Sequence, residues 1–185
     1  MMNKLIIILF LSLFIVSCKT PEARKPVSVK TGSFIDDSVK RNKKLNAEEL
    51  SSIKKVMDLQ PQNDFIASES GFYYYYNTKS ENDTLATPNF GDIIDYNYNV
   101  KTLDGTILYS KEDLQTQRYA MDQQELFTGL REGLKLMKTG ETVTFLFPSQ
   151  KAYGYYGDQN KIESNTPLIC EVTVLSITEN ENESN

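Results

Sequence analysis

The spacing of hydrophobic and polar residues changes along the chain and divides it into three parts. Leu5 to Val16 is an almost unbroken apolar run, too short to span a bilayer comfortably and typical of the apolar region of a signal peptide. Helical spacing follows in residues 33–60, and the period of two that strands show begins at Asp64. The pattern predicts a targeting segment, a helical region and a sheet-forming domain, in that order.

Within the helical region, the pattern predicts two consecutive helices. Ser33 is suited to cap the first, and the second begins at Asn46, where Asn46 and Glu49 have the spacing of a capping box. Pro61 ends the pattern, so residues 33–62 are assigned to a helical extension. Its apolar stripe is expected to pack against the main domain, or against a second copy of the chain in a homodimer formed through the N-terminal helices. The stripe consists of Leu50, Ile53, Val56 and Met57.

Residues 64–177 predict one α+β domain with five or six strands and one short helix. Consecutive aromatic residues favour a strand, and Asp104-Gly105 is a hairpin turn signal. Residues 125–138 have helical spacing, which Gly140 ends. Residues 178–185 are rich in Glu, Asn and Ser and are predicted to be disordered. The strands are expected at residues 72–76, 93–100, 107–109, 143–147 and 168–177.

The composition excludes several kinds of chemistry. The 185 residues contain no histidine, so Ser-His-Asp catalysis, Cys-His catalysis and histidine-containing zinc sites cannot occur. The formal net charge is −5 and the only basic run, residues 40–44, is short, which argues against nucleic acid as a partner. Three aspartates that could suggest a metal site have the spacing of turn residues instead, so we expect no metal and no cofactor. They are Asp92, Asp104 and Asp158.

The segment Ile15-Val16-Ser17-Cys18 resembles the lipobox of bacterial lipoproteins, with an apolar residue three positions before the cysteine and a small residue one before it. The resemblance implies removal of residues 1–17 and acylation of Cys18, for example with palmitate, which leaves residues 18–32 as a lipidated tether. Two or more acyl chains anchor a protein stably. We therefore expect a membrane-anchored lipoprotein of the cell envelope that faces the periplasm. An ordinary signal peptide followed by an incidental cysteine is the alternative.

Four segments of the domain resemble the FKBP-type peptidyl-prolyl cis-trans isomerases. The resemblance implies an FKBP-like curved antiparallel half-barrel wrapped on one short helix, with the helical extension outside it. It continues into residues 22–26 and 41–45, which look like those of the gliding-motility-associated lipoprotein isomerases of the Bacteroidota. The four segments are Phe90–Ile94 with Tyr96–Tyr98 and Asp104-Gly105 after it, residues 129–141, Phe147–Ser149 with Ala152–Asp158 after it, and residues 162–170.

The resemblance implies a proline pocket of eight residues. Tyr153 would donate a hydrogen bond to a substrate carbonyl, and Leu130 would form the floor beneath the proline ring. Backbone groups of Leu126 and Phe127 would bind the peptide. The implied catalytic residues are Tyr98, Phe127 and Tyr153, and the implied substrate-binding residues are Leu108, Leu126, Leu130, Ile162 and Cys170.

Isomerisation about an X–Pro bond suits a site without histidine, because the rotation moves no proton and forms no covalent intermediate. In the twisted transition state the amide resonance is lost, so a desolvated, aromatic-lined site binds the twisted form better than the planar one. The implied substrates are X–Pro segments of extracytoplasmic client proteins, whose folding the enzyme would assist, with a link to gliding motility.

Departures from the family pattern leave two other functions open. Leu130 replaces a usual Trp, Tyr109 stands where Asp is common, and Cys170 replaces an aromatic residue. Glu163-Ser164 also replace paired prolines. A looser pocket favours a chaperone or assembly factor of a motility or secretion apparatus, with the peptide groove retained and little turnover. A purely structural lipoprotein is the third alternative.

Overall fold

The computed structural model describes residues 31–82 and 84–180, with side chains from residue 35 onward. The chain separates into two units, Met1–Ser38 and Val39–Asn185, and the second contains the whole sheet. The expected signal peptide at residues 1–17 and the lipidation site Cys18 lie outside the described residues. So do the tether up to residue 30 and the tail beyond residue 180.

Helix α2 (Thr31–Asp58) is continuous over 28 residues, so the prediction of two separate helices is wrong. Residues 33–58 contain neither glycine nor proline, and nothing therefore interrupts the backbone hydrogen bonds. Asn46, expected as the cap of a second helix, lies in the helix interior. No helix within the described part of the chain is both long enough and apolar enough to cross a membrane.

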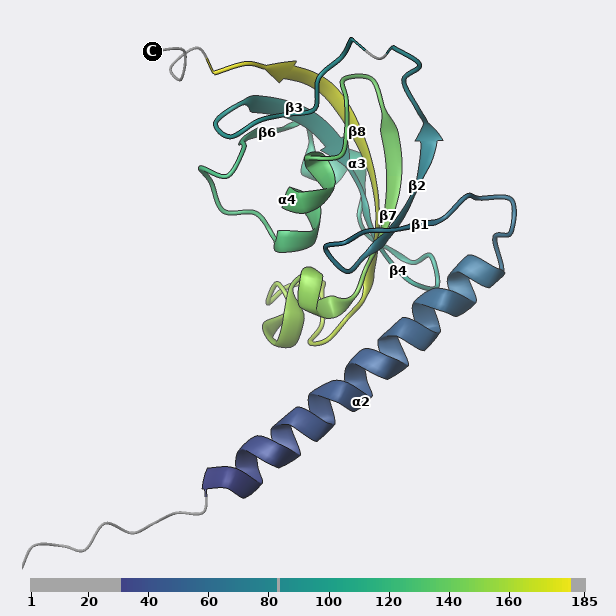
Figure 1. Cartoon of the computed structure of the whole chain (residues 1–185), viewed down its shortest axis with the longest axis vertical. Helices are drawn as coiled ribbons and strands as arrows, with labels where there is room; N and C mark the ends of the chain where they lie inside the picture. Colours follow the sequence, from purple (N-terminus) through teal and green to yellow (C-terminus); the bar gives the residue numbers. More distant parts are fainter. Residues whose placement is uncertain (1–30, 83, 181–185) are drawn as a thin grey trace, which may run out of the picture. The chain divides into compact units, whose positions relative to one another are not determined.

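The eight strands of the described chain form one antiparallel sheet (Figure 1). Its main path runs through β1 (Ile66–Ala67), β2 (Tyr73–Thr78), β7 (Thr142–Phe147), β8 (Leu168–Thr178), β3 (Ile93–Tyr98) and β6 (Gln117–Ala120). Off this path, β4 (Val100–Thr102) pairs with β5 (Ile107–Tyr109) and with β8. The sheet and the short helix α4 (Thr128–Leu134) make an α+β fold, which confirms the predicted fold class.

Several element boundaries differ from the prediction. The strand expected at 93–100 is divided at Asn99, whose side-chain oxygen accepts the Glu171 N–H (3.2 Å) while its own N–H donates to the Glu171 carbonyl (3.1 Å). The helix expected at 125–138 is limited to α4, because Phe127 has an extended backbone (ψ 140°) and the chain after Leu134 forms turns in which Leu136 and Met137 bond to the carbonyls three residues before them. Strands β1 and β6 and helix α3 (Lys111–Leu114) were not predicted.

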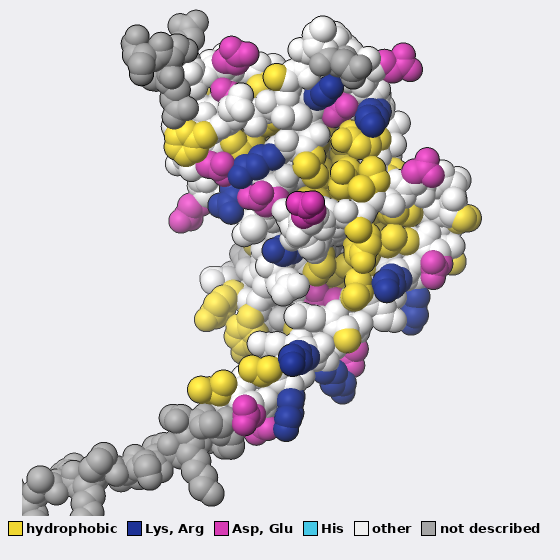
Figure 2. Space-filling model, viewed as in Figure 1, with side chains coloured by type: hydrophobic (Ala, Val, Ile, Leu, Met, Phe, Trp, Pro, Cys, Tyr) yellow, Lys and Arg dark blue, Asp and Glu magenta, His cyan; other side chains and the backbone are white. Residues whose placement is uncertain are grey.

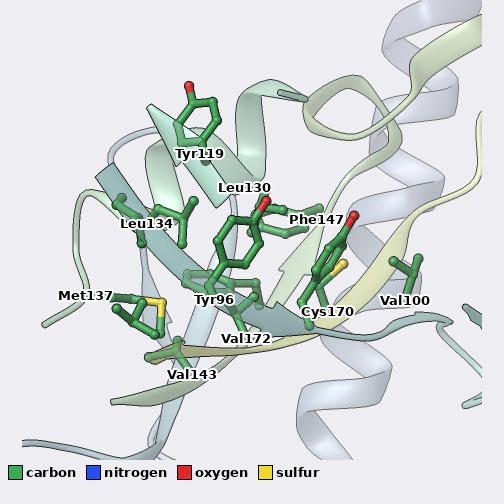
Figure 3. Close-up of a cluster of buried hydrophobic side chains, with 14 of the residues drawn as sticks. Tyr96, Val100, Tyr119, Leu130, Leu134, Met137, Val143, Phe147, Cys170 and Val172 are labelled. Carbon is green, nitrogen blue, oxygen red and sulfur yellow. The ribbon is translucent and has the colours of Figure 1, made fainter. Parts of the chain in front are cut away.

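The hydrophobic core lies where helix α4 packs on the sheet (Figure 3). Two glycines allow this close packing. A Cβ atom on Gly129 would lie 2.5 Å from a ring carbon of Phe147, and one on Gly133 would lie 2.9 Å from a ring carbon of Phe145. The two phenylalanine rings are stacked with centroids 5.4 Å apart. Helix α4 therefore lies directly on this pair of rings.

The part of α2 that follows Val39 is joined to the domain by a buried polar contact. Glu49 is 5% exposed and Ser149 is 2% exposed. The Glu49 carboxylate accepts the backbone N–H of Ser149 (2.8 Å) and the hydroxyl of Ser149 (2.6 Å). One turn farther on, Ile53 is fully buried. This part of the apolar stripe packs within the main domain, while the homodimer stays a prediction.

Candidate functional site

The inner wall of the candidate site is formed by buried residues from three elements. Tyr98 ends β3, Leu130 lies in α4 and Cys170 lies in β8, and all three belong to one hydrophobic cluster. Leu130 and Cys170 are fully buried and Tyr98 is 7% exposed. The Tyr98 hydroxyl makes no hydrogen bond with any described residue, so it is an unused polar group at the edge of an apolar wall.

Two aromatic rings form the rim. Phe127 stands immediately before α4, and Tyr153 stands between the short 3-10 helices η2 (Ser149–Lys151) and η3 (Gly154–Tyr156). Their ring centroids lie 5.1 Å apart, and the Phe127 ring also meets Phe147 edge-on at 5.5 Å. With Leu126, the two rings line a hollow of about 570 Å³. The rim therefore offers aromatic surface next to an open space.

Polar groups at this rim are free to bind a ligand. The N–H of Phe127 and the carbonyl of Leu126 make no backbone hydrogen bond to the described residues, because α4 begins only after Phe127. The Tyr153 hydroxyl is likewise unpaired within the described chain. Burial, followed by the neighbouring Cys170, Asp158 and Tyr109, raises the pKa of Tyr153 to about 12. The phenol is therefore a neutral donor at physiological pH.

The flap, residues 153–162, is held by Asp158. The Asp158 carboxylate accepts the backbone N–H of Asn160 (2.9 Å) and of Ile162 (2.8 Å), and it also accepts the hydroxyl of Tyr109. Desolvation acts to raise the pKa of Asp158, but these hydrogen bonds outweigh it and lower the pKa. At Gly157 (φ +62°) a Cβ atom would lie 2.1 Å from the Ile162 carbonyl oxygen, so only glycine fits.

Tyr109 connects the flap to strand β5. Its hydroxyl donates to Asp158 and accepts the side-chain N–H of Asn160 (3.0 Å), and Lys161 lies over its ring at 4.8 Å. The hydrogen bond to Asp158 is the main cause that raises the pKa of Tyr109. Tyr109, which departs from the family pattern, therefore attaches the flap to strand β5.

The structure brings all eight implied pocket residues into one neighbourhood. Tyr98, Leu130, Ile162 and Cys170 are in the buried cluster. Leu108, Leu126, Phe127 and Tyr153 pack against that cluster and are half-buried. Their roles in catalysis and binding stay predictions. No group of side chains suited to hold a metal ion occurs within the described residues.

Sequence reasoning missed the partners that position the site. Asp158 was interpreted as a turn residue, which it is, but its bond to Tyr109 joins residues 49 positions apart. The Glu49–Ser149 contact joins residues 100 positions apart. Neither pair leaves a local pattern in the sequence. For Asp158 the one available signal was its place directly after Gly157.

Comparison with known proteins supports the assignment of the domain. Residues 85–175 match the family model described as FKBP-type peptidyl-prolyl cis-trans isomerase. The chain is 30% identical to the human peptidyl-prolyl cis-trans isomerase FKBP9 over 88 residues, which is 47% of this chain and 15% of that protein. It is 31% identical to the FKBP-type isomerase FkpA of Aeromonas hydrophila over 111 residues, 60% of this chain and 40% of that protein.

Solved structures agree on the fold. A peptidyl-prolyl cis-trans isomerase from Pseudomonas syringae pv. tomato has a TM-score of 0.60 with 20% sequence identity, and covers 74% of this chain and 96% of its own. The chain therefore spans less than half the length of the two curated relatives named above, but nearly all of this structure.

Proposed function

We propose that this chain, whose residues 85–175 match the model of the FKBP-type peptidyl-prolyl cis-trans isomerase family, belongs to that family and catalyses cis–trans isomerisation of X–Pro bonds in client proteins. The observation that carries the proposal is the rim of Phe127 and Tyr153. It combines aromatic surface, unpaired backbone groups and a neutral phenol donor beside a water-accessible hollow. The family requires no cofactor.

The physical basis is stabilisation of the twisted amide. The barrier to rotation is about 18–20 kcal/mol, and spontaneous X–Pro isomerisation takes roughly tens to hundreds of seconds. The planar amide is more polar than the twisted one, so an apolar wall disfavours the planar form. Phe127 provides that wall, and the Tyr153 hydroxyl orients a carbonyl of the bound segment. No group has to gain or lose a proton.

The test is turnover of a panel of Ala-Xaa-Pro-Phe peptides by the purified protein. Wild type should accelerate the cis-to-trans step, and Phe127→Ala and Tyr153→Phe should each lower kcat/KM at least about tenfold, by the loss of wall or donor. Tyr156→Phe is the matched control for Tyr153→Phe, since Tyr156 is a tyrosine of the same flap that is 79% exposed. Wild-type rates equal to those in buffer would refute the proposal.

A second candidate function is a chaperone or assembly factor with little turnover. It is favoured by Leu130 and Cys170, which are fully buried and leave no large aromatic side chain at those two positions of the inner wall. Under this alternative, peptide turnover is absent while aggregation of an unfolded client is suppressed. Measuring both activities on one preparation separates the two functions.

The cellular setting is also a proposal, supported by the segment Ile15–Cys18 and by the resemblance of the N-terminal region to gliding-motility-associated lipoproteins. We propose a lipid-anchored envelope protein that faces the periplasm and acts on extracytoplasmic clients of the gliding machinery. On the face seen in Figure 2, Lys and Arg side chains are interspersed with Asp and Glu. The expectation that no nucleic acid binds stays a prediction.

The anchoring is tested by palmitate labelling and membrane fractionation of cells that express wild type or Cys18→Ala. Wild type should be labelled and sediment with membranes, and the variant should be neither. The link to gliding is tested by colony spreading of a strain whose chromosomal copy carries Tyr153→Ala. Normal spreading of that strain would remove the catalytic link to motility.

A further inference from the structure

Tyr96 is a buried tyrosine that the predicted pocket does not include. Alternate residues of β3 face the core, so Ile94, Tyr96 and Tyr98 lie on the same side of the strand. Tyr96 is 2% exposed. Figure 3 shows its ring rising from the sheet in the middle of the cluster, with the hydroxyl at the end away from Val143 and Val172.

The hydroxyl of Tyr96 has no hydrogen-bond partner among the described residues. Tyr119, in the same cluster, behaves differently: its hydroxyl donates to the Gln124 carbonyl (3.3 Å) and accepts the Asp122 N–H (3.2 Å). Polar groups of almost completely buried residues usually have a hydrogen-bond partner, so the Tyr96 hydroxyl calls for an explanation. For Tyr96 the structure offers no partner of its own.

The unpaired hydroxyl reaches a space that solvent can enter. Among the described side chains, no fully enclosed polar atom lacks a hydrogen-bond partner. Because the Tyr96 hydroxyl lacks one, it cannot be fully enclosed, although the residue as a whole is almost completely buried. Its electrostatic neighbours are Tyr119, Tyr153 and Cys170. Tyr153 and Cys170 belong to the implied proline pocket, and Tyr153 also lines the hollow at the rim.

Tyr96 is an aromatic residue in a part of the cluster where the helix and the last strand contribute small or aliphatic side chains. Leu130 on α4 and Cys170 on β8 are both fully buried, and neither is aromatic. Tyr96 and Tyr98 stand side by side with ring centroids 5.5 Å apart and an angle of 40° between the rings. Strand β3 therefore provides the aromatic rings that helix α4 and strand β8 do not provide at Leu130 and Cys170.

We propose that Tyr96 is a substrate-contacting residue that determines specificity: its ring supports the bound proline, and its hydroxyl donates a hydrogen bond to a carbonyl oxygen of the X–Pro segment. The inference rests on the proposed isomerase function and adds to it the residue that sets the polarity of the pocket interior. Ligands without an acceptor at that place leave the hydroxyl unpaired and bind more weakly.

The test compares Tyr96→Phe with wild type in the full protein. The variant keeps the ring and removes only a hydroxyl that makes no hydrogen bond to the described protein, so the free energy of unfolding should not fall. Activity on an Ala-Leu-Pro-Phe peptide should drop about fivefold to tenfold in kcat/KM, the equivalent of one hydrogen bond to the ligand. Tyr74→Phe is the matched control, a half-buried tyrosine of β2 outside the pocket.

Unchanged kcat/KM in Tyr96→Phe, within twofold, would overturn the proposal. A loss of activity matched by an equal loss of stability would also overturn it, because it indicates a structural role alone.

Titration of the same peptide into protein with carbon-13-labelled tyrosine provides a readout that does not need turnover. If wild type is inactive, the isomerase function fails. A shifted Tyr96 resonance together with weaker binding of peptide to Tyr96→Phe still supports the contact, and an unmoved resonance refutes it.

Discussion

Replacement of Glu49 by alanine should loosen both helix α2 and the loop that leads to the flap. The wild-type carboxylate accepts two hydrogen bonds from Ser149, at 2.8 and 2.6 Å, in a site where both residues are buried. Hydrogen bonds to charged groups contribute about 1.5–3 kcal/mol each. Two such hydrogen bonds at the lower end of this range contribute about 3 kcal/mol. A loss of this size is also found when one partner of a buried polar pair is removed.

The assay is chemical unfolding of Glu49→Ala combined with amide hydrogen exchange at Ser149. The variant should lose about 3 kcal/mol if α2 unfolds together with the sheet. If α2 separates first, the global loss is smaller, and the loss of protection at the Ser149 amide reports the same energy locally. Glu48→Ala is the matched control, because the neighbouring Glu48 side chain is 63% exposed and forms an ion pair with Lys44 on the same helix at 3.8 Å.

The two variants make the same change in helix propensity, so the difference between them isolates the buried contact. A double-mutant cycle with Ser149→Ala assigns the share of the hydroxyl, and the backbone N–H accounts for the rest. The reasoning is refuted if Glu49→Ala and Glu48→Ala agree within about 0.5 kcal/mol in unfolding and Ser149 exchanges at the wild-type rate in both.

Four further outcomes are expected. The pKa of Tyr153 is raised to about 12 by burial, so kcat/KM measured from about pH 6 to 10 should be flat; a titration near pH 7 would contradict a neutral donor. Desolvation raises the pKa of Asp158, but hydrogen bonds lower it below the ordinary value of 3.8. The ionised carboxylate therefore stabilises the flap fully above about pH 3.8, and this stabilisation is lost as the pH falls through the pKa of the folded state. Protection of the Ile162 amide should follow this course, and in Asp158→Asn it should already be reduced at about pH 6. Burial raises the pKa of Cys170, so a thiol reagent should label it only as fast as the protein unfolds. In Gly157→Ala a Cβ would lie 2.1 Å from a carbonyl oxygen, so the flap should be displaced and the activity lost. Amide spectra and turnover are compared with those of Gly154→Ala, where a Cβ would meet nothing within 4 Å.

The sequence predicted the elements whose pattern is local. The alternation in residues 93–98 and the apolar residues of 143–147 and 168–177 specify the three central strands, since each of these strands buries one or both faces. Strand β6 begins with the polar residues Gln117 and Arg118, so the local pattern does not predict a strand there. Its pairing with β3 is a property of the tertiary fold. Helix α2 was divided in error because Asn46 is suited to cap a helix but is also tolerated inside one.

The resemblance to a known family predicted only the apolar and aromatic residues of the candidate site. Leu130, Phe127 and Tyr153 stand in motifs that can be aligned without a gap, so their neighbourhood could be anticipated. Tyr109 and Tyr96 could not, because their interest depends on hydrogen bonds that form, or fail to form, across the fold. The alternation that places Tyr96 beside Tyr98 was visible, but the sequence does not show whether the Tyr96 hydroxyl finds a hydrogen-bond partner in the fold.

The attachment of α2 through Glu49 also has a mechanical meaning. From Val39 the helix runs unbroken to Asp58, and a load applied at its start reaches the sheet by two routes. One is the chain itself, through residues 59–65 to β1. The other crosses from Glu49 to Ser149, four residues before Tyr153. The second route enters the chain between β7 and the flap, so tension on the helix from Val39 onward acts on the segment that leads to Tyr153 as well as on β1.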